Sequence, residues 1–184
     1  GSGWKPAGAV GKTCAADCAL AGQEVRICDL DPFFESTLGN VDKTGVTIGP
    51  KLPGTQTKYG FERWGKAKFA LATNSVAEAV KGAKLIIVGI PSVAHETFFK
   101  ELIPYLEDGQ IIHIIPDNYG SLELRKMMRE AGCDKKVIIG GWSSAPYGTR
   151  VDTEGGVPNA HVSLVYRAIT LRGAALPMTD QEDF

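Results

Sequence analysis

The sequence has few residues of the kinds that build metal centres or disulfide frameworks. Its four cysteines contain no C-x-x-C pair, and neither they nor the three histidines have the spacing of a zinc site. No metal ligands are therefore predicted. Cys14 and Cys18 stand four residues apart on one expected helix and are interpreted as small buried residues. Reduced thiols and the lack of a charged-then-apolar leader predict a cytoplasmic protein.

Charge of one sign and long apolar runs are also missing. Lys and Arg total 20 against 21 Asp and Glu, so nothing electrostatic predicts nucleic acid or an anionic membrane as partner. The runs "LIIVGI" and "IIHIIP" are strand-sized and far short of the roughly 20 residues of a membrane span. The 184 residues, 43% of them apolar, suffice for one domain with a core and are few for two.

The chain does contain a repeated alternation of apolar strands and helices. Short connections that contain glycine join them, which favours an α/β fold: a Rossmann-like, doubly wound, mostly parallel sheet. Two β-type segments within 161–177 are expected as added edge strands. The other elements are predicted as helices over 11–20, 75–82 (capped by Ser75), 93–107 and 121–132, and strands over 24–30, 68–73, 84–91, 110–116 and 135–142.

The segment "PAGAVGKTCAAD" (6–17) approaches two different phosphate-binding patterns. In a Walker A loop, Gly11-Lys12-Thr13 would close the motif, with Pro6 in place of the first glycine. Such a site also needs an acidic residue after another apolar strand to hold magnesium. The sequence offers only Asp117, which follows a proline. An NTPase is therefore the less favoured interpretation.

The dinucleotide-binding pattern makes a separate prediction that the sequence meets. An acid should end the second strand about 20 residues after the glycines and bind the adenosine ribose. Asp29 ends "EVRIC" 18 residues after Gly11. Gly8, Ala9, Val10 and Gly11 are then assigned to the pyrophosphate turn at the helix N-terminus. A carboxylate at Asp29 would repel a 2′-phosphate, which favours NAD over NADP.

The N-terminal end departs from this pattern in two ways. Pro6 occupies the position of the first glycine, and "GSGWK" is not an apolar first strand. Two alternatives stay open. Either the central strand is absent from these residues, or Gly1 and Gly3 are the first glycines of the motif and are followed by an insertion.

Further cofactor-binding candidates follow the buried strands, because ligands of open α/β sheets lie at the carboxyl ends of the strands. Ile90, Pro91 and Ser92 follow the strand over 84–91 and are assigned to the cofactor mouth, with a simple turn as the alternative. Pro116 and Asn118 follow the next strand and are weaker candidates of the same kind.

No general acid is assigned among the histidines, since none has a carboxylate at a telling spacing. His95 is expected to cap a helix or lie at the surface, and His113 to be a hydrogen-bonded core residue. Residues 140–150, "GGWSSAPYGTR", are interpreted as a loop. Within it, Arg150 is a candidate two-pronged donor to a substrate carboxylate, with packing against another domain as the alternative.

Several segments, in their order along the chain, resemble the N-terminal domain of the opine (octopine/nopaline) dehydrogenases. They are "GKTCAADCALAGQEVRICDL", "SVAEAVKGAKLIIVGIPSVAHETFFKELIPYLEDGQ", "PDNYGSLELRKMMREAG", "SSAPYGTR" and "AALP". The resemblance covers most of residues 8–178 and is thinnest over 40–67. It implies a dinucleotide-binding domain over 1–178 and, over 179–184, the start of a linker to a helical C-terminal domain outside this chain.

The resemblance also implies an activity. In this family an α-keto acid and the amino group of an amino acid form an imine, which NAD(P)H reduces to a secondary amine. The catalytic residues are expected in the C-terminal domain, so this chain should bind cofactor and turn over poorly alone. A homodimer is compatible with the resemblance. The competing hypotheses are a non-catalytic nucleotide-sensing Rossmann domain and another 2-hydroxy- or keto-acid dehydrogenase of the same superfamily.

Overall fold

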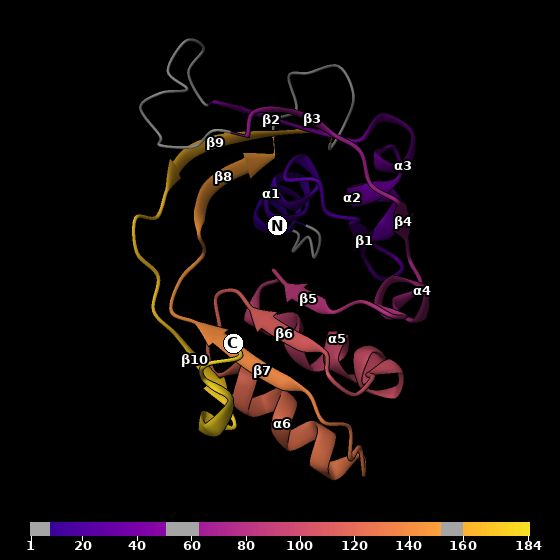
Figure 1. Ribbon diagram of the computed structural model, residues 1–184. Helices are drawn as coiled ribbons and strands as arrows, with labels where there is room; N and C mark the ends of the chain where they lie inside the picture. Colours follow the sequence, from indigo (N-terminus) through magenta and orange to yellow (C-terminus); the bar gives the residue numbers. More distant parts are fainter. Residues whose placement is uncertain (1–7, 51–62, 152–159) are drawn as a thin grey trace.

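The computed structural model describes residues 8–50, 63–151 and 160–184. Parallel strands form two hydrogen-bonded groups (Figure 1). One pairs β1 (Arg26–Cys28) with β4 (Leu71–Thr73). The other has the order β10–β7–β6–β5, with β5 (Leu85–Val88), β6 (Ile111–Ile114) and β7 (Ile138–Trp142) parallel and β10 (Gly173–Leu176) antiparallel at the edge.

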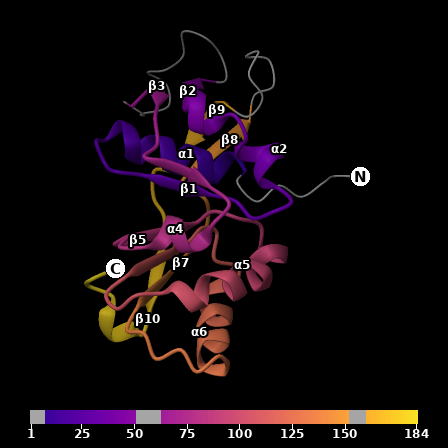
Figure 2. The ribbon, with the colours of Figure 1, turned by 90° about the vertical axis from the view of Figure 1, so that its right-hand side faces the viewer.

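Helices cover both faces of the parallel strands, as Figure 2 shows. On one face lie α5 (His95–Leu102) and α6 (Gly120–Glu130), and on the other lies α1 (Ala9–Leu20). The other helical segments of the described residues are α2 (Phe34–Leu38), α3 (Val41–Thr44), α4 (Val76–Val80) and the 3-10 turns η2 (Ser92–Ala94), η3 (Ile103–Tyr105) and η4 (Met178–Asp180). Within the described ranges no helix has the length and apolarity needed to cross a membrane.

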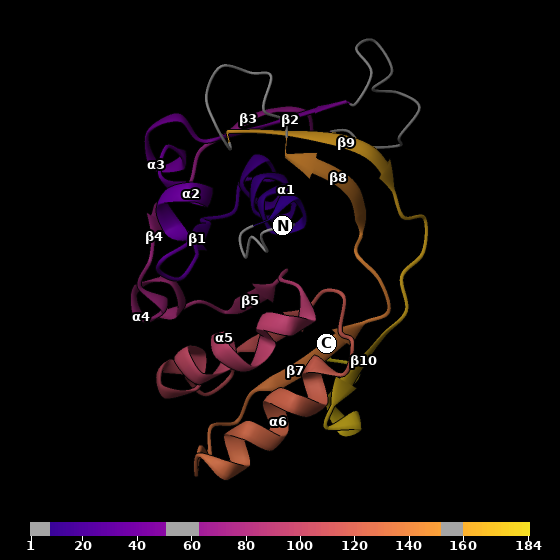
Figure 3. The same cartoon turned by 180° about the vertical axis from the view of Figure 1, so that it is seen from behind.

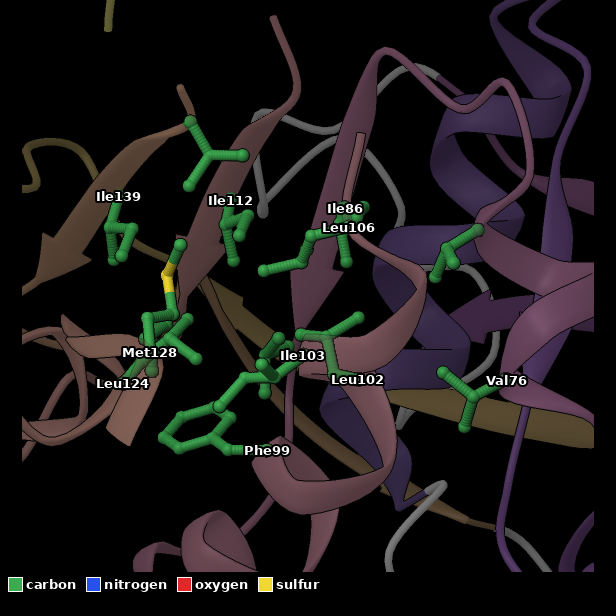
Figure 4. Close-up of a cluster of buried hydrophobic side chains, with 14 of the residues drawn as sticks. Val76, Ile86, Phe99, Leu102, Ile103, Leu106, Ile112, Leu124, Met128 and Ile139 are labelled. Carbon is green, nitrogen blue, oxygen red and sulfur yellow. The ribbon is translucent and has the colours of Figure 1, made fainter. Parts of the chain in front are cut away.

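The main core lies between β5, β6 and β7 and the helices α5 and α6 (Figure 4). Its fully buried side chains come from the continuous apolar strands and from the helical stripes that the sequence shows. Phe99, Leu102, Ile112, Leu124 and Ile139 are all 0% exposed. The periodicity that predicts the helices is therefore the same periodicity that fills this core.

A second sheet lies over α1 on the side away from the parallel strands (Figure 1). Its order is β3–β2–β9–β8, from β2 (Val46–Pro50), β3 (Gly65–Ala67), β8 (Tyr147–Val151) and β9 (His161–Arg167). Only the pair β2–β9 is parallel in it. A second core, which includes Ala16, Leu38, Ile48 and Leu164, fills the space between α1 and this sheet.

The structure confirms the α/β class and the order of elements from 9 to 142. Ser75 caps α4 as expected, since its hydroxyl accepts the Glu78 N–H at 3.3 Å. β10 confirms an added edge strand, but β9 is not at that edge and pairs instead with β2 and β8. β7 ends at Trp142 as the predicted strand over 135–142 does, but the expected loop over 140–150 was wrong at its far end, because Tyr147–Val151 form β8. The position of β9 and the formation of β8 both depend on strand pairing between segments that are distant in the sequence. The local sequence pattern carries no information on such pairing.

The last residues fold back onto the sheet. Phe184 lies with its ring centroid 4.6 Å from that of His113 and 5.1 Å from that of Trp142. The Gln181 side chain accepts the N–H of Ala175 in β10 at 2.9 Å. In this structure residues 178–184 are therefore packed against β6, β7 and β10, although the domain boundary at 178 stays a prediction.

A buried carboxylate ties α1 to the second sheet. Asp17 is 7% exposed and accepts hydrogen bonds from the guanidinium of Arg63 and from the hydroxyl of Tyr147 on β8. Burial, together with the contact to Asp17, raises the pKa of Tyr147, which therefore stays protonated and donating at neutral pH. The three side chains hold α1 against a strand that is 130 residues away in the sequence.

Replacing Asp17 by alanine should lower the free energy of unfolding by about 1–3 kcal/mol, because the buried Tyr147 hydroxyl loses its acceptor. Urea unfolding followed by circular dichroism measures the change. Asp134→Ala serves as the control, since Asp134 is exposed and its loss should stay within about 0.5 kcal/mol. Equal effects of the two substitutions would contradict a stabilising role for the Asp17 contacts.

Candidate functional site

The N-terminus of α1 presents free main-chain amides. Gly8 is the N-cap, and among the described residues no side chain caps this end of the helix and no acid lies in its first turn. The Lys12 amide is the first to find an intrahelical partner, the Gly8 carbonyl at 3.1 Å. The amides of Ala9, Val10 and Gly11 precede it and carry the positive end of the helix dipole. This is the arrangement that binds a phosphate group.

Two glycines bring this helix end against the carboxyl end of β5. A Cβ on Gly89 would lie 3.2 Å from both the Cα and the N atom of Gly11, which are backbone atoms with little room to move. A Cβ on Gly11 would lie 3.6 Å from the Gly89 carbonyl oxygen, an ordinary contact. The close approach therefore depends mainly on Gly89. Gly89 was not among the residues predicted from the sequence, although a glycine directly after an apolar strand was a visible signal.

The predicted residues after β5 divide between core and surface. Ile90 is 9% exposed and belongs to the main core, so its side chain supports the loop from below. Pro91 and Ser92 are exposed at the start of η2. Val93, 83% exposed beside them, is an apolar side chain that the sequence analysis did not single out.

The loop after β6 lies at the same edge of the sheet. Pro116 is half-buried and Asn118 is exposed. Asn118 and Tyr119 adopt positive φ angles of 43° and 67°, which turn the chain into α6. Tyr119 is 79% exposed and offers an aromatic surface there, a second residue that local pattern did not identify.

Asp29 follows β1 at its carboxyl end, where the sequence predicts it. Its carboxylate is 1% exposed and accepts the Leu30 N–H at 2.9 Å and the Thr37 hydroxyl of α2 at 2.6 Å. Thr37 is a positioning residue that sequence spacing did not reveal. The assignment of Asp29 to the cofactor stays a prediction.

The groups that a Walker A site would need are engaged elsewhere. The Thr13 hydroxyl donates to the Ala9 carbonyl at 2.7 Å and lies 2.9 Å from the Thr149 hydroxyl in β8. Lys12 is 1% exposed, inside the packing of α1. Asp117 caps α6, accepting the Ser121 N–H at 2.7 Å. Within the described ranges no cluster of His, Cys, Asp and Glu suits a metal ion. The geometry therefore disfavours the NTPase interpretation.

The histidines near the site are packing groups. His95 is 0% exposed and stacks on Phe99 with ring centroids 5.2 Å apart, so the expected capping or surface role was wrong. Burial lowers the pKa of His95 and of His113, which are neutral at pH 7. His113 is half-buried and packs edge-on against Trp142 rather than making the expected core hydrogen bond in this structure.

The thiols of α1 and β1 are not nucleophiles either. Burial raises the pKa of Cys14 and of Cys28 to about 12, so both are protonated at neutral pH. The two thiols are therefore not candidates for nucleophilic chemistry at this site.

Arg150 is not brought to this site. It follows Thr149 in β8, and Thr149 faces α1 through its contact with Thr13. Successive side chains of a strand point to opposite faces, so Arg150 lies on the far face of the second sheet. Its guanidinium donates to the Thr149 carbonyl at 2.9 Å. A role in holding a substrate carboxylate beside the cofactor loops is not supported by this placement.

Comparison with known proteins identifies the family of the chain. The chain is 32% identical over 150 residues, 80% of its length, to an opine dehydrogenase of Arthrobacter sp.. The chain belongs to the opine dehydrogenase family. It is also 30% identical over 103 residues to the octopine dehydrogenase of Pecten maximus. The matched region spans 38% of the length of the first relative and 24% of the second. A comparison with models of protein families found no match.

Solved structures of opine dehydrogenases share the fold. An octopine dehydrogenase with NADH and L-arginine matches 91% of this chain with a TM-score of 0.75 and 19% identity, over 40% of its own chain. A yersinopine dehydrogenase with NADP+ bound matches 92% with a TM-score of 0.69 and 13% identity, over 39% of its own chain. A ketopantoate reductase from Ralstonia eutropha is similar over 86%, with a TM-score of 0.59 and 18% identity, covering 44% of that chain.

Gly89→Ala should lower the free energy of unfolding by about 1–3 kcal/mol, because the new methyl group forces the start of α1 away from β5. Gly11→Ala is the matched control: its methyl group meets only ordinary contact, and alanine favours a helix, so stability should be unchanged or slightly higher. Urea unfolding of both variants measures the difference. A larger loss for Gly11→Ala would show that the contact is not the constraint described.

Proposed function

We propose that this chain is the nucleotide-binding part of an opine dehydrogenase and holds NAD(H) at the carboxyl edge of its parallel strands. The 32% identity with an opine dehydrogenase over 150 residues carries the proposal. The uncapped first turn of α1 beside Gly89 supports it, because free amides and close backbone approach fit a pyrophosphate.

Each part of the cofactor has a counterpart in the chain. The amides of Ala9, Val10 and Gly11 hold the pyrophosphate, and Gly8 leaves room for it. Asp29, held in place by Thr37, accepts the adenosine ribose hydroxyls and repels a 2′-phosphate, which favours NAD over NADP.

The nicotinamide half would lie over the exposed loops that follow β5 and β6. Pro91 and Ser92 line this half beside β5, and Ile90 supports them from the core. When bound, the cofactor would supply a hydride. The loops would orient the cofactor and exclude water from one side of the reaction.

In the complete enzyme, in this proposal, the amino group of an amino acid condenses with an α-keto acid to an imine and releases water. Hydride from the nicotinamide cofactor and a proton would then reduce the imine C=N bond to CH–NH. Its nucleotide domain spans residues 1–178, and its catalytic residues belong to a C-terminal domain. The octopine dehydrogenase with NADH and L-arginine supports this substrate class through its own ligands. A cytoplasmic location and a homodimer belong to the same proposal.

The ketopantoate reductase likeness supports a second candidate, a dehydrogenase of hydroxy or keto acids in the same superfamily. Its TM-score of 0.59 is lower than the 0.75 of the octopine dehydrogenase, which is why the first candidate is preferred. Reduction of a keto acid in the absence of any amino acid, by the enzyme with both domains, would favour the second. A nucleotide sensor would bind NADH and reduce neither.

Calorimetric titration with NADH, NADPH and Mg-ATP tests the binding proposal. NADH should bind most tightly, and Asp29→Ala should weaken it about 10- to 100-fold, the effect of losing a charged hydrogen-bond acceptor. Asp31→Ala is the control, because Asp31 is exposed two residues further along and should leave NADH affinity unchanged.

Thermal unfolding of Asp29→Ala separates lost binding from lost fold, since this substitution also removes the acceptor of the Thr37 hydroxyl. Binding of Mg-ATP alone would refute the nicotinamide assignment and restore the NTPase interpretation. Equal affinities for NADH and NADPH would still agree with a dinucleotide site. They would contradict the proposal that the Asp29 carboxylate repels a 2′-phosphate.

A further inference from the structure

His95 lies where the loop that follows β5 meets the loop that follows β6. It is the first residue of α5, and its N–H donates to the Ser92 carbonyl in the loop after β5. Its ring lies against Gly120, the first residue of α6, where the loop after β6 ends. The two helices lie side by side on one face of the parallel strands (Figure 3). His95 therefore contacts both loops at the carboxyl edge of the sheet.

The contact with Gly120 leaves no room for a side chain at position 120. A Cβ on Gly120 would lie 2.6 Å from both Nδ1 and Cε1 of His95, and 3.1 Å from Cγ2 of Ile114. The ring has little freedom to move aside, because it is 0% exposed and stacks on Phe99 with ring centroids 5.2 Å apart. Glycine at position 120 thus lets α6 start directly against the His95 ring.

The ring of His95 makes this contact through its shape. Among the residues that the structure describes, neither of its nitrogens has a hydrogen-bond partner, and the Glu123 carboxylate lies 3.9 Å from Nδ1. Burial lowers the pKa of the ring and outweighs the opposite effects of Glu123, the Ile90 backbone and Asp117, so the ring is neutral at pH 7. A buried polar group without a partner costs stability. Stability alone therefore does not explain a histidine here.

The loop after β6 is fixed at its base and again at its end. At the base, Ile115 donates its N–H to a carbonyl of β5 at 2.9 Å, and Asp117 donates to a carbonyl of β7 at 2.8 Å. Residues 118–119 are exposed and have positive φ angles. The chain becomes buried again at Gly120. The contact between His95 and Gly120 therefore sets where the exposed part of this loop lies relative to the loop after β5.

We propose that His95 is a positioning residue for the nicotinamide half of the cofactor, because its packing against Gly120 sets the spacing between the loops after β5 and β6. This inference rests on the proposed function, in which those loops hold that half of NAD(H). The pyrophosphate and the adenosine lie at α1 and Asp29 in the same proposal. Loss of the contact should therefore affect one half of the cofactor and spare the other.

Calorimetric titration of the 184-residue chain with NADH and with ADP-ribose, which lacks the nicotinamide, tests this division. Wild type should bind NADH about tenfold more tightly, because the ordered loops add contacts to the nicotinamide. His95→Ala should remove this preference by weakening NADH binding alone, since the binding-competent loop arrangement would be populated for only about a tenth of the time. Gly120→Ala should do the same, because its methyl group strikes the His95 ring.

Two further variants separate positioning from a general loss of packing. Leu102→Ala removes a side chain that is 0% exposed at the far end of α5, and should leave the ratio of the two affinities unchanged. His95→Phe keeps a flat ring without the unpartnered nitrogens, and should keep the preference for NADH. Loss of the preference in His95→Phe would overturn a role that depends on shape.

Amide hydrogen exchange without nucleotide follows the loop itself. In His95→Ala, exchange should become about tenfold faster at Ser121, whose N–H bonds to the Asp117 carboxylate in the loop after β6. Exchange at Met128, further along α6, should stay unchanged in this variant, as should exchange at both amides in His95→Phe.

The two readouts distinguish failure of this inference from failure of the proposed function. Binding of neither NADH nor ADP-ribose would refute the proposed function and, with it, the nicotinamide role of His95. Unchanged exchange at Ser121 in His95→Ala, equal weakening of NADH and ADP-ribose, or a wild type without preference for NADH would each overturn the inference. Each of these three results would leave nucleotide binding by α1 and Asp29 in place.

Discussion

The backbone contact between Gly11 and Gly89 is the constraint on which the candidate site depends. It sets the first turn of α1 directly against the carboxyl end of β5, so that free helix amides and strand-end loops share one edge of the sheet. A side chain on Gly89 would separate the two. The positions of the loops after β5 and β6 relative to a bound phosphate all follow from this approach.

Helix α1 is shared between two layers. On one side its small residues line the cavity between β1 and β5. On the other side Thr13 and Asp17 make polar contacts with β8. These contacts use polar groups that a phosphate-binding lysine–threonine loop would direct at a nucleotide. In the proposed function the helix binds the nucleotide through its backbone, while Thr13 and Asp17 hold the second sheet in place.

The sequence predicts the parts of the fold that local pattern controls. Helical stripes and continuous apolar runs locate α5, α6, β5, β6 and β7, and Ser75 marks the start of α4. Pairing between strands that are distant in the sequence produces no such local pattern. The second sheet, with β8 inside an expected loop and β9 away from the expected edge, appears only when residues far apart in the chain are brought together.

The same distinction holds for the site. The glycine turn and the strand ends follow from spacing, and the structure brings Gly11 and the loop after β5 together. Which face of a strand Arg150 occupies depends on the neighbour of Thr149, and the burial of His95 depends on α6. Two points of the sequence analysis lie outside the described residues. They are the alternative in which Gly1 and Gly3 are the first glycines of the motif, and Pro6 in place of a glycine.

The contact between Thr13 and Thr149 joins residues 136 positions apart. At roughly 5–20 residues per second, a ribosome needs on the order of ten seconds to make the chain between them. During that interval α1 has been synthesised without β8, one of the strands that cover it. The polar contacts that Thr13 and Asp17 make with the second sheet therefore form only after residues 147–149 have been made.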